Sequence, residues 1–118
     1  FYFNNGKLQS LEGFPNEVRG GVFFNWNQLQ TLHNIHHHIE VMNGLLDISF
    51  NPVKDSILGI LLIKGMTGIY VPNDEDGRFS RYHRALRIIK PYVGEGRQGI
   101  IDAQQELIDN NLDEYAEF

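Results

Sequence analysis

The 118-residue sequence contains no cysteine, so neither a disulfide framework nor a thiolate metal site can form. It also lacks a long apolar run. The longest, residues 57–63, is interrupted by Gly59 and is far too short to cross a bilayer. No basic segment followed by an apolar one opens the chain, so we expect no secretory signal, no membrane association and a cytoplasmic location.

Sequence motifs of common enzymes are missing as well. There is no phosphate-binding glycine loop and no H-E-x-x-H metal motif. The serines at positions 10, 49, 56 and 80 have no nucleophile elbow around them. We therefore expect no cofactor and no enzymatic activity. The net charge of −5 further argues against a protein that coats nucleic acid.

What the sequence does have is enough apolar bulk for one folded domain. Hydrophobic residues make up 42% of the chain and charged residues 21%, and there are eight Phe, five Tyr and one Trp. This composition is typical of a globular chain with a core, and the length favours a single domain at most.

The first 35 residues repeat themselves at an interval of 21 positions. Five residue pairs are identical at this offset: Phe3/Phe24, Asn4/Asn25, Leu8/Leu29, Gln9/Gln30 and Leu11/Leu32. A unit this short cannot bury its own apolar face, so we expect successive copies to stack with their leucines in a common core. A third copy, in which the repeat pattern is less well preserved, begins near Val53.

Each copy is predicted to contain one short strand, because apolar residues such as Val22 and Phe24 recur with period two. The predicted strands lie near Phe1–Asn4, Val22–Asn25, Leu45–Ser49 and Met66–Val71. Asparagines that follow a strand, such as Asn27 and Asn51, are expected to hydrogen-bond the peptide groups of the bend. Phe1 already falls within a copy, which we interpret as an N-terminally incomplete repeat array.

The phrase L-x-S-L-x-G-x-P, from Leu8 to Pro15, resembles short, irregular leucine-rich repeats of the kind found in uncharacterised proteins of large tailed bacteriophages. The resemblance extends from Phe1 to about Val71, although His36 replaces the proline in the second copy. It implies an α+β repeat fold: a leucine-rich-repeat-like solenoid of about four parallel strands over residues 1–72. It also implies a viral protein acting in a host cytoplasm.

The pattern becomes helical after the turn-forming segment Pro72–Gly77. Phe79, Tyr82, Leu86 and Ile89 fall on one helical face, and this helix should stop before Pro91. A second helix is predicted from about Ile100 to Asn110, followed by a short turn of helix near Tyr115. We expect residues 73–118 to form a helical cap on the solenoid.

Four histidines form the first cluster with possible chemistry: His33, His36, His37 and His38. Imidazole is a good ligand for zinc, nickel or copper. The last three, however, align with the turn Pro15–Glu17 of the first copy, and consecutive residues do not converge easily on one metal. We interpret the cluster as an exposed turn, with metal binding as the alternative.

Five basic residues without an intervening acid form the second cluster: Arg78, Arg81, Arg84, Arg87 and Lys90. Their spacing of three winds around a helix, and acidic residues dominate the chain that follows. We expect the basic helix to lie against the acidic segment through weak surface ion pairs. The alternative is binding of an acidic protein or a nucleic-acid backbone, with the nearby Tyr82 and Tyr92 stacking on bases.

The exposed face of the predicted strands is the third candidate site. Phe23, Asn25 and Asp47 should point away from the core, and Trp26 either joins this surface or fills the end of the solenoid. We therefore predict a non-enzymatic module that binds an unidentified protein through the strand face or the capped end. The alternative function is association with nucleic acid through Arg78–Lys90.

Overall fold

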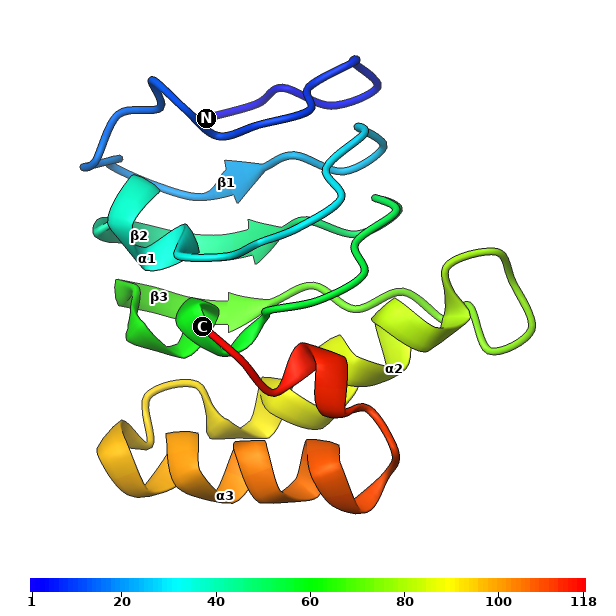
Figure 1. Ribbon diagram of the computed structural model, residues 1–118. Helices are drawn as coiled ribbons and strands as arrows, with labels where there is room; N and C mark the ends of the chain where they lie inside the picture. Colours follow the sequence, from blue (N-terminus) through cyan, green and yellow to red (C-terminus); the bar gives the residue numbers. More distant parts are fainter.

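Three short parallel strands form one open sheet in the computed structural model, which describes residues 1–118 (Figure 1). The strands lie in the order β1-β2-β3. Along the chain the elements are β1 (Val22–Phe23), α1 (Ile35–His38), β2 (Val41–Asp47), the 3-10 helix η1 (Leu58–Leu62), β3 (Lys64–Ile69), α2 (Ser80–Ile89), the 3-10 helix η2 (Lys90–Tyr92), α3 (Gly96–Asp109) and the 3-10 helix η3 (Asp113–Tyr115).

The predicted solenoid of about four parallel strands is wrong. The structure is a small α+β domain with principal extents of 34 × 31 × 21 Å, and its sheet has only three strands. The segment predicted as the first strand, Phe1–Asn4, makes an isolated bridge between Tyr2 and Phe23 and no ladder. The spacing between paired strand residues also departs from the 21-residue interval. Val22 pairs with Leu46, and Leu46 pairs with Ile69, both more than 21 positions further along the chain. The strict 21-residue period therefore does not continue past the first connection.

Close approach of the strand backbones depends on two glycines. Gly44 has a φ of 147°, and a Cβ there would lie 2.9 Å from the backbone nitrogen of Gly21. Gly65 has a φ of 83°, and its Cβ would lie 2.1 Å from the carbonyl oxygen of Met42. Both positions combine a left-handed backbone with contact to a neighbouring strand, so they require glycine.

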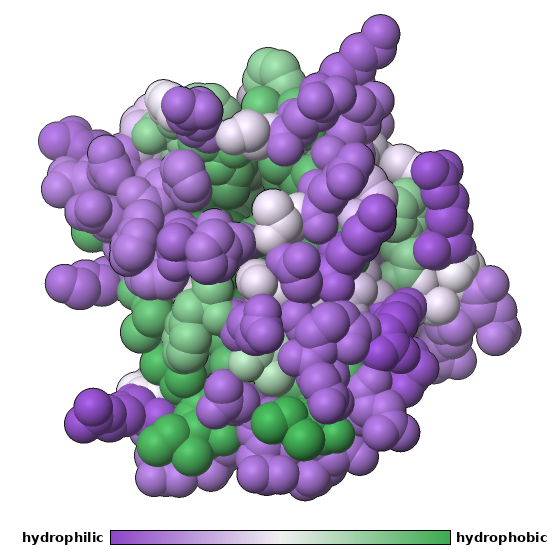
Figure 2. Space-filling model, viewed as in Figure 1, coloured by the Kyte–Doolittle hydropathy of each residue, from purple (hydrophilic) through white to green (hydrophobic).

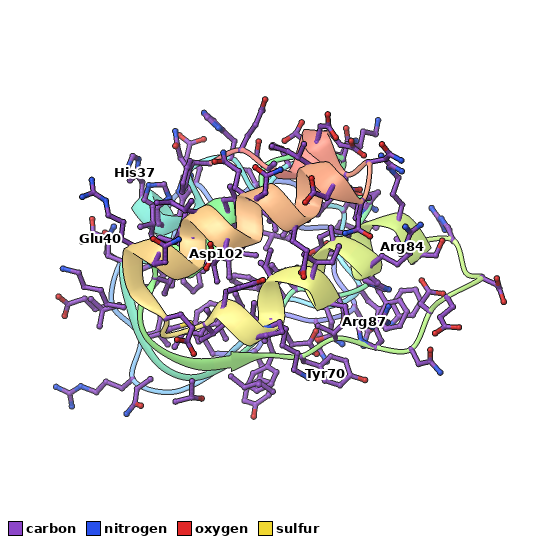
Figure 3. All side chains as sticks on the ribbon, turned by 90° about the horizontal axis from the view of Figure 1, so that it is seen from below. His37, Glu40, Tyr70, Arg84, Arg87 and Asp102 are labelled. Atoms are coloured by element: carbon purple, nitrogen blue, oxygen red, sulfur yellow. The ribbon has the colours of Figure 1, made fainter.

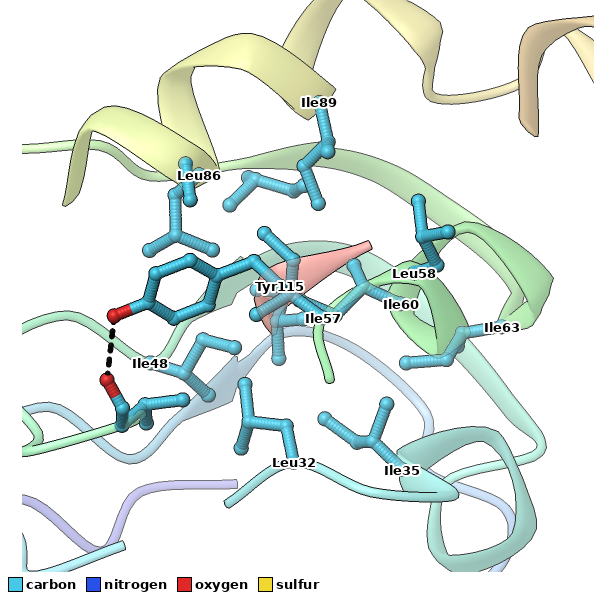
Figure 4. Close-up of a cluster of buried hydrophobic side chains, with 14 of the residues drawn as sticks. Leu32, Ile35, Ile48, Ile57, Leu58, Ile60, Ile63, Leu86, Ile89 and Tyr115 are labelled. Atoms are coloured by element: carbon cyan, nitrogen blue, oxygen red, sulfur yellow. Dashed lines mark hydrogen bonds between the residues drawn. The ribbon is translucent and has the colours of Figure 1, made fainter. Parts of the chain in front are cut away.

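The core is one continuous cluster of 26 buried side chains. Leu29 and Leu32 are 0% and 1% exposed, which confirms their predicted burial. Figure 4 shows how Leu32 and Ile48, from the first half of the chain, lie in the same cluster as Leu86 of α2 and Tyr115 of η3. The core therefore continues across the boundary predicted at residues 72/73, and the division into two domains remains a prediction.

Buried asparagines stabilise the bends that follow β1 and β2. Asn51 accepts a hydrogen bond from the N–H of Leu29 (3.1 Å) and donates to the carbonyl oxygens of Phe24 and Ile48 (3.0 and 3.1 Å). Asn27 likewise accepts from the N–H of Leu8 (3.1 Å) and donates to the carbonyl of Phe24 (2.9 Å). These contacts confirm the predicted role of the asparagines, since buried peptide groups need partners.

The helices α2 and α3 lie below β3 in Figure 1. The apolar stripe from Phe79 to Ile89 does form a helix, which ends at Ile89 before a 3-10 turn containing Pro91, as predicted. Two buried tyrosines connect residues 73–118, which we call the helical segment, to residues 1–72, which we call the strand segment. Tyr82 donates to the carbonyl of Ile48 (2.7 Å) and Tyr115 to that of Val53 (2.9 Å), the latter drawn in Figure 4.

The last residues of the chain return to the strand segment. The N–H groups of Ser56, Ile57 and Leu58 donate to the carbonyl oxygens of Glu114, Tyr115 and Glu117, at distances of 3.0–3.1 Å. The C-terminal segment therefore forms part of the folded core region instead of extending away from it.

Candidate functional site

The face of the sheet that points away from the core carries a row of exposed apolar side chains. Val22, Leu46 and Ile69 point inward and are at most 1% exposed. Because strand residues alternate between faces, their neighbours point outward. The outward residues that define what we call the outer sheet face are Tyr2, Phe23, Leu45, Asp47 and Tyr70. No helix covers this face, and Figure 3 shows Tyr70 projecting from the sheet on the side away from α3.

The side chains of the outer sheet face lie flat because glycines leave room beneath them. A Cβ on Gly21 would lie 2.7 Å from the ring of Phe23, and one on Gly68 would lie 3.5 Å from Cδ1 of Leu45. Tyr2 stacks on Phe23, with ring centroids 4.6 Å apart and ring planes 5° from parallel. Tyr2 and Phe23 therefore form one stacked aromatic pair on this face.

Asp47 is not an exposed contact on this face, which corrects its predicted role. The residue is only 9% exposed. One carboxylate oxygen, Oδ1, accepts hydrogen bonds from both the N–H (3.1 Å) and the hydroxyl (2.6 Å) of Ser49. The carboxylate of Asp47 therefore stabilises the turn at the end of β2 and is not available to a partner. Asn25, also predicted on this surface, is half-buried, and its carbonyl accepts from the N–H of Asn5 (3.1 Å).

Three aromatic rings pack together beside the outer sheet face, at the carboxyl ends of the strands. Trp26 stacks on Phe50 with centroids 4.3 Å apart and planes 4° from parallel, and Phe79 meets both rings edge-on at 5.9 Å. Trp26 remains 46% exposed, so it lies on the surface and does not fill an end of the core. The guanidinium of Arg78 lies 5.1 Å from the centre of the Phe79 ring.

Beneath these rings lies a buried histidine that sequence reasoning missed. Nε2 of His83 accepts a hydrogen bond from the N–H of Phe50 (2.9 Å), so the ring proton resides on Nδ1. Nδ1 lies 3.1 Å from Oδ2 of Asp74, although at an angle that is not that of a hydrogen bond. Burial lowers the pKa of His83 below its ordinary value, even though Asp74 acts in the opposite direction. His83 is 0% exposed, and its hydrogen bond joins α2 to the bend after β2.

The predicted basic cluster does not form one charged surface. Arg81 pairs with Glu114 and also donates to the carbonyl of Asn111. Arg87 donates to the carbonyl of Pro72 (2.9 Å), on the side of α2 nearer Tyr70 in Figure 3. Arg84 and Lys90 are exposed and form no ion pair. The expected pairing with the acidic segment is thus made by Arg81 alone.

The histidine cluster lies on and beside the single turn of α1, where we expected an exposed turn. His37 is exposed (Figure 3), but His36 is half-buried with an unpartnered Nδ1. Burial, and then the neighbouring His37 and His33, lower the pKa of His36. No three His, Asp or Glu side chains anywhere in the chain converge on a point that could hold a metal ion.

Three members of the outer sheet face were missed from the sequence: Tyr2, Leu45 and Tyr70. They are 73%, 38% and 44% exposed. The alternation of strand residues could have identified them. Leu45 and Tyr70 are each next to an inward-pointing residue, Leu46 and Ile69, and Tyr2 pairs with Phe23, which is next to the inward-pointing Val22.

A scan against models of protein families finds no match to this chain. Searches of curated proteins and of solved structures find no significant match either. Among the helices of the structure, none has the length and apolar character required to span a membrane.

Proposed function

We propose that this protein is a non-enzymatic binding module that engages a protein partner through the outer sheet face. The observation that supports this proposal is the row of exposed apolar side chains on a helix-free side of the sheet. Tyr2, Leu45 and Tyr70 expose 73%, 38% and 44% of their surfaces there. Contiguous apolar surface of this kind is a feature of protein interaction sites.

The composition of this surface also favours a protein partner. Aromatic residues are enriched at the centres of protein interfaces, whereas exposed charges are depleted there. The only charged member of the outer sheet face is Asp47, whose carboxylate is engaged by Ser49. A partner could therefore cover the face without leaving a buried charge unpaired.

The alternative function, nucleic-acid binding through α2, has less support. Of the five basic residues, Arg81 and Arg87 are held by contacts within the protein, and Arg78 lies over Phe79. This leaves Arg84 and Lys90 as the cations without a partner. We further propose that this is a viral protein that acts in a host cytoplasm. The support for this part of the proposal is the sequence resemblance of Leu8–Pro15 alone.

Selection from a phage-displayed library of random peptides tests the proposed surface. We expect peptides that bind the wild-type protein and lose about tenfold or more in affinity for a Tyr2→Ser, Tyr70→Ser double variant, since exposed aromatic anchors dominate binding energy. The control variant is Ile108→Ser, which alters an apolar residue that is 42% exposed on α3, away from the sheet. Its peptide affinities should equal those of the wild type.

Two outcomes would contradict the proposal. One is a selection that yields no binding peptide, and the other is a set of peptides that bind the double variant as tightly as the wild type. A labelled single-stranded DNA oligonucleotide, titrated in parallel, addresses the alternative. Binding that falls steeply with added salt would favour nucleic acid, because neutralising phosphates releases counterions.

A further inference from the structure

A groove separate from the outer sheet face has the size of a small-molecule site. It lies between η1, the start of β3 and the first turns of α3, and its volume is about 780 Å³. Figure 2 shows apolar surface gathered on this side of the molecule, at the lower left beside the start of α3. Pockets for small ligands span roughly 300–1,000 Å³ and are mostly apolar. The groove shares no residue with the outer sheet face.

The lining of the groove is mostly apolar and open to solvent. Leu62, Ile101 and Phe118 line it and are 41%, 52% and 37% exposed, while Met66 and Ile100 are more deeply placed. Large side chains of this kind are seldom gathered at the surface without a ligand or partner. An alkyl chain laid along them would remove both its own surface and theirs from water.

The charged side chains that line the groove are both positive. Lys64, at the start of β3, and Arg97, in the first turn of α3, line it, and no Asp or Glu does. Neither cation has a carboxylate within ion-pairing distance: the Arg–carboxylate pair in the protein is Arg81–Glu114, and the other close contact, His83–Asp74, involves neither Lys64 nor Arg97. Neither side chain donates a hydrogen bond within the protein. In a chain with a net charge of −5, two unpaired cations on one apolar groove point to an anionic ligand.

The backbone at the start of α3 also carries a positive partial charge. The position before the helix, Glu95, makes no side-chain capping hydrogen bond, and Gly96 lines the groove. The free N–H groups of the first turn therefore add a positive partial charge next to Arg97. This contribution reinforces the two side-chain charges.

We propose that this groove binds a medium-chain alkanoate, with the alkyl chain on Leu62, Met66 and Ile101 and the carboxylate at Arg97 and Lys64. A guanidinium matches the two oxygens of a carboxylate, and the ammonium of Lys64 adds a second charge-assisted contact. The inference is independent of the proposed function, since it concerns a different surface and a different class of ligand.

Calorimetric titration with decanoate, below its micelle concentration, tests this site. We expect a dissociation constant below about 1 mM, and about tenfold or weaker binding for an Arg97→Gln, Lys64→Gln double variant, because hydrogen bonds to charged groups are lost. Decyltrimethylammonium has the same chain and the opposite charge, and it should bind about tenfold more weakly than decanoate or not at all. Amide shifts in NMR spectra should cluster at residues 61–66 and 93–104.

The matched control is an Arg19→Gln, Lys54→Gln double variant. It removes the same total charge from two exposed residues outside the groove, and it should bind decanoate as the wild type does. The proposal is overturned by absence of decanoate binding, by equal affinities for the two double variants, or by equal affinities for decanoate and the cationic amphiphile. NMR shifts spread evenly over the surface would overturn it as well.

Discussion

The two ends of the sheet differ in how they are covered. Below β3, the helical segment buries Leu86, Ile89 and Leu107 completely. On the β1 side no helix of the described chain packs over the sheet, and Phe1 and Phe3 are 46% and 47% exposed. The sheet thus has a covered end and an open end. The comparison teaches that apolar residues at the edge of the sheet are buried where helices pack against them and stay partly exposed where none do.

The same contrast appears in how the bends after the strands are stabilised. Near the open end, Asn27 is the side chain that bonds the peptide groups of the bend. Near the covered end, Asn51 is joined by two α2 side chains, because Tyr82 bonds the carbonyl of Ile48 and His83 the N–H of Phe50. The helical segment therefore contributes hydrogen bonds to the strand segment as well as apolar contact.

The largest expected effect comes from the covered end. Leu107→Ala removes a side chain that is 0% exposed on α3, and the free energy of unfolding should fall by about 2–5 kcal/mol. The adjacent Ile108, 42% exposed on the same helix, is the control, and Ile108→Ala should cost less than about 1 kcal/mol. Urea denaturation of both variants measures the difference. Equal losses would show that α3 does not pack as described.

The two asparagines give a second, smaller contrast. Asn51→Ala should lower the free energy of unfolding by about 1–3 kcal/mol, since it leaves the buried N–H of Leu29 without a partner and removes one of the donors to the carbonyls of Phe24 and Ile48. Asn27→Ala should cost less, because two of its three partners, the N–H of Leu8 and the carbonyl of Phe3, are only partly buried. Thermal and urea unfolding would rank the two variants. The reverse order would mean that the open end is as well enclosed as the covered end.

The smallest effect is the pH dependence contributed by His83. Its pKa is lowered in the folded protein, so the unfolded chain binds the proton more readily. The contribution to stability is therefore full above the unfolded pKa of about 6.5 and is lost as the pH falls from there through the folded pKa. We expect the free energy of unfolding to decrease between about pH 7.5 and pH 5.5. His36, whose pKa is also lowered, adds to the decrease.

A His83→Gln variant isolates this contribution. Its free energy of unfolding should change less over the same pH range than that of the wild type, whatever its absolute stability. If the slope of His83→Gln matched that of the wild type, the buried environment of His83 would not govern the pH response.

The sequence predicted the elements whose signals are local. The helical spacing of Tyr82, Leu86 and Ile89 identified α2, and Pro91 marked its end. The asparagines after the strands were assigned the correct hydrogen-bonding role. The number of strands was wrong because it depends on ladders between distant segments, and Phe1–Asn4 makes only one bridge.

The candidate site was less predictable for a related reason. Whether Arg81 is free depends on Glu114, and whether His83 is buried depends on Phe50, each more than 30 residues away in the sequence. Residue spacing carries no information on such pairs. Likewise, Lys64 and Arg97 line the same groove only because α3 packs near the start of β3.

The parallel register of the strands has a consequence for folding kinetics. Val22 meets Leu46, and Leu46 meets Ile69, only after a long connection has closed, so the sheet contains no hairpin that could form early by itself. The entropy of closing each loop is lost before the contacts compensate for it. This chain should consequently refold more slowly than a helical bundle of equal length, with α2 and α3 as the segments best able to gain structure first.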